Sequence, residues 1–146
     1  MDKMSKFGER LNELLFQNNI TPEKLASNMN VSISTVYRWK NNETKLFLSN
    51  LVALANYLNC SIDFLLGRND EILTFHPIRD LPKFSLRLRE VMKEKGMSTY
   101  RLRRETRYDG KYFEKWDNGS DPLALTLIEL ADILDCTVDY LIGREK

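Results

Sequence analysis

The sequence contains an internal repeat, and this repeat limits the architectures that the chain can adopt. At an offset of 77, identical residues recur; the first-copy positions are Phe7, Arg10, Leu11, Glu13, Leu25, Trp39 and Asn41, and their matches are Phe84, Arg87, Leu88, Glu90, Leu102, Trp116 and Asn118. After a one-residue deletion, LVALANYLNCSIDFLLGR (51–68) matches LIELADILDCTVDYLIGR (127–144). The repeat predicts two domains, 1–68 and 82–146, joined by a linker, 69–81.

Each copy has the hydrophobic spacing of short helices. In the first helix of each copy, apolar residues recur at i, i+4, i+7 and i+8, which predicts one buried stripe. These residues are Phe7, Leu11, Leu14 and Leu15, and Phe84, Leu88, Val91 and Met92. Ser61 and Thr137 are placed to cap a fifth helix, and Gly67 and Gly143 suit its C-terminal turn. We therefore expect an all-α fold of two five-helix domains.

The most informative stretch is LASNMNVSISTVYRWKNN, residues 25–42. Thr21 and Pro22 begin a helix that runs to about Met29. Asn30 follows where a tight turn requires a left-handed backbone, which asparagine tolerates. Ser32 can cap the next helix, which runs to Lys40. Val36 and Trp39 anchor this helix in the core, so Ile33, Ser34, Tyr37 and Arg38 point outward.

This stretch resembles the repressor-type helix-turn-helix family of bacteria and phages, the lambda/Cro-like or XRE-like group. The resemblance rests on Leu25-Ala26, the turn residue Asn30, Val31-Ser32, and Val36 three residues before Trp39. It also rests on the endings DFLLGR and DYLIGR of the two copies. It implies that the third helix enters the DNA major groove. Carried over by position, base contact falls to Ile33, Ser34, Thr35, Tyr37 and Arg38, and phosphate contact falls to Ser32, Asn41 and Asn42.

The second copy, LRRETRYDGKYFEKWDNG (102–119), departs from this pattern. Arg103 replaces the small alanine, Arg107 occupies the turn position, and Asp109 replaces the capping serine, where its carboxylate would repel a phosphate. The region is nevertheless basic. We expect it to contact DNA more weakly and mainly through phosphates; the residues are Arg104, Arg107, Lys111, Tyr112 and Lys115.

The overall charge of +1 does not indicate a nucleic-acid partner, but its distribution does. Residues 84–116 hold ten Lys or Arg and five Asp or Glu, whereas residues 117–146 hold two and seven. One face of the second copy can therefore meet phosphates while the acidic remainder faces solvent. The expected partner is double-stranded DNA, and a homodimer is possible.

Several other classes of protein are disfavoured. Two cysteines and one histidine are too few for a zinc site, so we expect no metal or other cofactor. No catalytic spacing is recognisable, and no small-molecule substrate is evident. Because no apolar run is long enough for a membrane helix and the start lacks an apolar signal region, we expect a cytoplasmic protein without a membrane partner. The alternative function is an antitoxin-like or anti-repressor module that binds another polypeptide.

The region between the copies has two prolines and no helical period. Its apolar residues Ile72, Leu73 and Phe75 can dock on a neighbouring domain or pair with another chain, and docking is favoured. At about 3.3 to 3.6 Å per residue, the fifteen residues 69–83 extend to about 50 Å.

Overall fold

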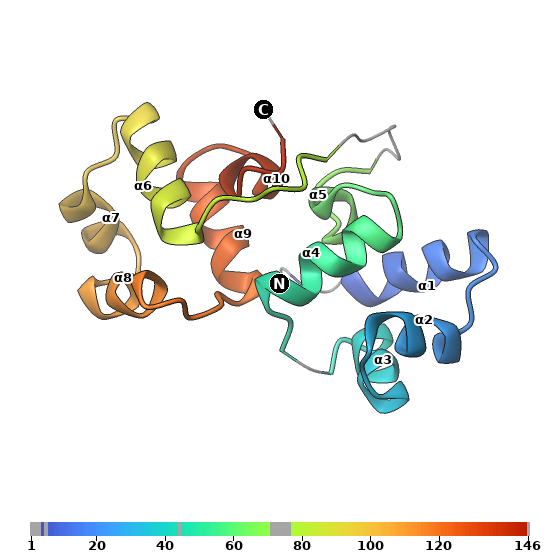
Figure 1. The fold of residues 1–146 in the computed structure, drawn as a ribbon. Coiled ribbons are helices and arrows are strands. Elements are labelled where there is room, and N and C mark those ends of the chain that lie inside the picture. The colour runs from blue at the N-terminus through green and yellow to red at the C-terminus, as the bar shows by residue number, and fades with distance from the viewer. Residues whose placement is uncertain (1–3, 5, 44, 71–76, 146) are drawn as a thin grey trace. The chain divides into compact units, whose positions relative to one another are not determined.

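The computed structural model describes residues 4, 6–43, 45–70 and 77–145. Within these ranges the chain forms ten helices and no strand, which confirms the all-α fold of two five-helix copies (Figure 1). The first copy comprises α1 (Phe7–Gln17), α2 (Pro22–Met29), α3 (Ile33–Lys40), α4 (Leu48–Tyr57) and α5 (Ile62–Leu65). The second comprises α6 (Phe84–Glu94), α7 (Thr99–Glu105), α8 (Gly110–Asp117), α9 (Ala124–Ile133) and α10 (Val138–Leu141).

Two compact units correspond to the two copies. The first holds α1 to α5 together with Leu123–Leu125, and the second holds α6 to α8, α9 from Thr126 onward, and α10. The residues Ile72, Leu73 and Phe75, for which docking is predicted, lie outside the described residues.

In the first unit, α3 packs against α1 and α2, and α5 packs against α1 and α4. The predicted stripe on α1 is buried, since its four members are each at most 4% exposed; they are Phe7, Leu11, Leu14 and Leu15. Trp39 is 1% exposed, which confirms its place in the core. Burial of apolar surface stabilises a fold by about 25 cal/mol per Å². The apolar faces of these helices thus provide the main stabilisation of the unit.

The second unit has a more aromatic core. Here α8 and α10 pack against α6. The ring of Trp116 lies 5.3 Å from that of Phe84 and 5.4 Å from that of Phe113, both edge-on. Tyr108 is 1% exposed and lies 5.8 Å from Trp116, whereas Val31 at the matching position of the first unit is half-buried. Larger side chains therefore fill the second core.

The helix ends follow local chemistry. The Oγ1 of Thr21 accepts a hydrogen bond of 3.1 Å from the Lys24 N–H, as predicted for the start of α2. Ser61 and Thr137 cap α5 and α10 in the same way. Gly67 and Gly143 have φ angles of 78° and 84°, which a Cβ would strain, so these glycines end the two short helices as predicted.

Candidate nucleic-acid interface

The turn between α2 and α3 has the predicted left-handed residue. Asn30 has φ 57° and ψ 45°, and the Val31 N–H donates to the Ala26 carbonyl at 3.0 Å, which closes the end of α2. Leu25 and Ala26 are buried beneath this turn, at 0% and 5% exposure. The small side chain of Ala26 lets α2 and α3 pack closely. The turn therefore sets the direction of α3 relative to α2.

Helix α3 has a buried face and an exposed face. Val36 and Trp39 are buried, whereas Ile33 and Tyr37 remain 40% and 42% exposed. Ser34 and Arg38 are exposed as well, and Thr35 is half-buried. Ser32 accepts from the Thr35 N–H at 3.1 Å and caps the helix. An apolar side chain, hydroxyls, an aromatic ring and one guanidinium are thus presented together to solvent.

The end of α3 is joined to the start of α1. The Asn42 Oδ1 accepts a 2.9 Å hydrogen bond from the Gly8 N–H. A Cβ on Gly8 would lie 2.2 Å from the Lys40 carbonyl oxygen, so the two helices meet backbone to backbone. Asn41 is exposed beside this contact. Asn42, predicted to contact phosphate, therefore also has a structural task that the sequence did not reveal.

The second unit builds the corresponding turn differently. Helix α7 ends at Glu105, and Thr106 is extended, with φ −135° and ψ 175°. Its Oγ1 donates to the Leu102 carbonyl at 2.7 Å and accepts from the Tyr108 N–H at 3.1 Å. Every residue of this turn is described, and none has a positive φ. Arg107 thus avoids the left-handed conformation that the aligned Asn30 adopts.

The exposed surface of α7 and α8 is basic, but some of its cationic side chains are paired with acidic ones. Lys111, Lys115 and Arg104 are exposed, and Tyr112 is 37% exposed. Arg107 forms an ion pair of 2.6 Å with Glu129. The hydrogen bond to the Tyr108 hydroxyl, together with the Glu129 carboxylate, raises the pKa of Arg107 above its ordinary range. Asp109 caps α8 by accepting from the Lys111 N–H at 3.0 Å.

The family model of the Cro/C1-type HTH DNA-binding domain matches the sequence twice, over residues 10–71 and 87–146. The chain belongs to this family. It is therefore a DNA-binding protein of the regulator type, and the family is typically not enzymatic. Neither a curated protein nor a solved structure matches the chain.

Both copies of the Cro/C1-type domain contain an ion pair that the sequence analysis missed. Asp63 and Asp139 lie in the first turns of α5 and α10, where an acid complements the helix dipole, and each also binds an arginine five residues later. Arg68 Nε donates to Asp63 at 2.9 Å, and Arg144 Nη1 donates to Asp139 at 2.7 Å. The recurrence of Asp and Arg in DFLLGR and DYLIGR was the available signal.

A second missed feature is an arginine on the first helix of each domain. Arg10 donates to the Phe64 carbonyl at 3.0 Å and lies 4.2 Å from the centre of the Phe64 ring. Arg87 donates to the Tyr140 carbonyl at 2.8 Å and lies 4.7 Å from that ring. Their identity at the 77-residue offset was the sequence signal. Each guanidinium ties the first helix to the fifth.

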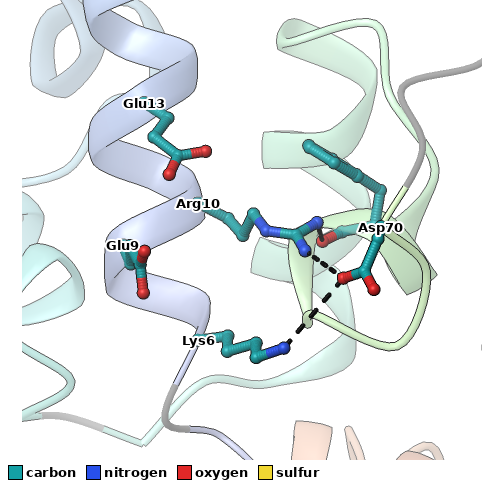
Figure 2. Close-up of a pocket in the computed structure, with 6 residues that line it drawn as sticks. Lys6, Glu9, Arg10, Glu13 and Asp70 are labelled. Carbon is teal, nitrogen blue, oxygen red and sulfur yellow. Dashed lines mark hydrogen bonds and ion pairs between the residues drawn. The ribbon is translucent and has the colours of Figure 1, made fainter.

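The Arg10 site lines an open groove of about 290 Å³ on the first unit (Figure 2). Lys6, Arg10 and Asp70 lie within ion-pairing distance there, and Glu9 and Glu13 project from the same face of α1. Among the described residues, no group of three or more metal-ligating side chains forms a metal site. No helix in the described ranges is long and apolar enough to cross a bilayer.

Proposed function

We propose that the chain is a cytoplasmic, sequence-specific transcriptional regulator of the repressor kind, and that α3 enters the major groove of duplex DNA. The observation that carries this proposal is the exposed face of α3. It combines hydrogen-bonding and apolar groups on a helix whose opposite face is anchored by Val36 and Trp39. A rigid helix that presents such groups suits the reading of base edges.

The chemistry of this face assigns a role to each residue. Arg38 would donate to guanine O6 and N7, Ile33 would lie against a thymine methyl, and the Ser34 hydroxyl would serve either a donor or an acceptor. Thr35 and Tyr37 would complete the base contacts. Phosphate contacts would come from the flanking residues Ser32, Asn41 and Asn42.

The second unit would contact DNA mainly through phosphates. Arg104, Lys111 and Lys115 supply exposed cations, and Tyr112 adds a hydroxyl. Arg107 would contribute less, because its guanidinium is already paired with Glu129. Since the two exposed faces differ, a single chain would cover an asymmetric site in which one half is strongly specified.

Selection of bound sites from a random duplex library tests the proposal, followed by footprinting and salt titration of the full chain. We expect an asymmetric motif and an affinity that falls steeply with salt. A palindromic motif bound by a homodimer would overturn the single-chain arrangement. The absence of both enrichment and salt-dependent binding would overturn the DNA-reading function itself.

A further inference from the structure

The two copies differ in where they place a long and a small side chain at two matching positions. In the first copy, Ala26 in α2 is buried and Ile33 at the start of α3 is 40% exposed. In the second copy, the same positions hold Arg103 in α7 and Gly110 at the start of α8. The first copy therefore has its long side chain on the second helix of the pair, and the second copy has it on the first helix.

The guanidinium of Arg103 lies over Gly110. A Cβ on Gly110 would lie 3.3 Å from Arg103 Nη2 and 3.6 Å from its Cζ. Because non-bonded heavy atoms pack best at about 3.5 to 4.0 Å, any other residue at position 110 would crowd the guanidinium. The φ of Gly110 is not positive, so the backbone does not require glycine there. The missing side chain instead leaves room for Arg103.

The charge of Arg103 is available to a ligand. The other arginines of α7 and of the turn after it form ion pairs with carboxylates; they are Arg101, Arg104 and Arg107, at 3.3, 3.8 and 2.6 Å. Arg103 is exposed, and none of the described residues forms an ion pair or a hydrogen bond with its guanidinium. A ligand that binds this group would therefore displace no carboxylate.

The position of this guanidinium favours a base edge over a phosphate. Residues near the start of a recognition helix contact bases, and Ile33 occupies this position in the first copy. In the second copy Gly110 has no side chain, so the Arg103 guanidinium takes this place. The neighbouring Asp109 is exposed and caps α8, which puts a carboxylate at the same helix start. A carboxylate repels a phosphate but not a neutral base.

We propose that Arg103 is the specificity-determining residue of the second unit, and that its guanidinium donates to O6 and N7 of a guanine in the major groove. The proposal rests on the proposed function, in which the second unit contacts DNA mainly through phosphates, and it adds one base contact to that half of the site. Gly110 is the positioning residue, because it keeps the space that the guanidinium occupies.

Four variants of the full chain separate base reading from phosphate binding. Arg103→Ala removes the guanidinium and introduces the small residue of the first copy, which suits a helix. Arg104→Ala is its matched control, because it removes the same charge from the adjacent exposed residue. Arg103→Lys keeps the charge but loses the planar pair of donors that a guanine requires. Gly110→Ala keeps the arginine and places a Cβ 3.3 Å from its Nη2.

Selection from a random duplex library, followed by competition binding, measures the effects. The wild-type motif should contain a guanine whose selection Arg38→Ala leaves unchanged. Arg103→Ala should lower the preference for this guanine by about 5- to 150-fold. Arg103→Lys should lower it as well, and Gly110→Ala should lower it by a smaller factor. Arg104→Ala should keep the preference and reduce the salt slope by about one.

A guanine analogue that has carbon in place of N7 tests the contact directly. It should weaken binding by the wild type and leave binding by Arg103→Ala unchanged, because only the wild type uses N7. Urea unfolding followed by Trp116 fluorescence checks that each variant is folded, and Arg103→Lys decides the question if Arg103→Ala is unstable.

Three outcomes would overturn the proposal. If Arg103→Lys keeps the full guanine preference, or if Arg103→Ala weakens all duplexes alike, Arg103 contacts a phosphate, and the regulator function still stands. The same holds if no position of the selected motif responds to Arg103. If the wild-type chain enriches no motif and its binding does not depend on salt, the proposed function fails, and the role of Arg103 fails with it.

Discussion

The α2–α3 turn and the α7–α8 turn join equivalent helices by different local chemistry. The first relies on the left-handed Asn30, and the second on the Thr106 hydroxyl, which bonds the chain on both sides. The helices that follow are nevertheless equally anchored, by Trp39 and by Trp116, at 1% and 4% exposure. The buried faces therefore determine how the two helices pack, while the turn between them can change if its polar groups are satisfied.

The surfaces of these two helices differ more than their cores. The face of α3 combines Ile33, Ser34, Tyr37 and one arginine, whereas α7 and α8 present several cations beside acidic residues. In the second unit Asp117, at the end of α8, binds Arg89 through both oxygens, at 2.6 and 3.0 Å. A mixed face suits base reading, and a cationic face suits phosphates.

The largest expected difference concerns the two aspartate–arginine pairs. Asp139→Ala should lower the free energy of unfolding of the second unit by about 3 to 5 kcal/mol, because Arg144 would be left buried without this carboxylate. Asp63→Ala should cost the first unit about 1 to 3 kcal/mol, because the Arg68 side chain is 22% exposed and can reach water.

Urea unfolding can follow each unit separately, since each contains one tryptophan. Trp39→Phe leaves Trp116 as the reporter, and Trp116→Phe leaves Trp39. Asp139→Ala combined with Arg144→Met is the control, and it should recover part of the loss. Equal losses at Asp63 and Asp139 would contradict the assigned difference in burial.

The next effect concerns DNA affinity. Arg38→Ala should cost about 1 to 3 kcal/mol on the preferred site and relax preference at one position, because a base-reading guanidinium is lost. Lys115→Ala at the matching position should weaken all sequences alike and reduce the salt slope by about 1. Binding titrations on the selected site and on shuffled duplexes measure both. Uniform weakening by Arg38→Ala would instead assign Arg38 to a phosphate.

A smaller effect should separate the two turns. Asn30→Val should destabilise the first unit by about 1 to 2 kcal/mol, because a β-branched residue is unfavourable at φ 57°. Arg107→Val should lower the free energy of unfolding of the second unit by less than about 1 kcal/mol, because that turn needs no left-handed residue. The substitution removes only an exposed ion pair with Glu129, and such pairs contribute little. Unfolding midpoints of the two variants provide the measurement, and equal costs would show that both turns need the same backbone.

The smallest expected effect is the pH dependence of the Arg89–Asp117 pair in the second unit. The hydrogen bond from Arg89 lowers the pKa of Asp117 below its ordinary value of 3.8. The pair therefore stabilises the fold above that value, and its contribution is lost as the pH falls through the lower folded pKa. The first unit has Lys40 at this position and lacks the pair.

The difference in unfolding midpoint between wild type and Asp117→Asn measures this contribution. It should be present at about pH 5 and should disappear as the pH is lowered below the folded pKa. A difference that stays constant over this range would show that the carboxylate charge of Asp117 contributes nothing.

Features that depend on neighbouring residues could be predicted from the sequence. Apolar spacing identified the buried stripes, Thr21 and Ser32 marked helix starts, and Asn30 marked the left-handed turn. These features could be predicted because capping bonds and helical periodicity act over three or four residues. For the same reason the exposed positions of α3 could be identified, while their roles toward DNA stay predictions.

Contacts between residues that are distant in the sequence could be identified only in the folded chain. Arg10 and Asp70 are 60 positions apart, and Asn42 meets Gly8 across 34. Likewise, the basic run of the second copy is partly neutralised by Glu129, which lies 22 positions from Arg107. Charge and spacing alone do not state which partner a long side chain reaches, because that depends on where the packed helices bring their polar groups together.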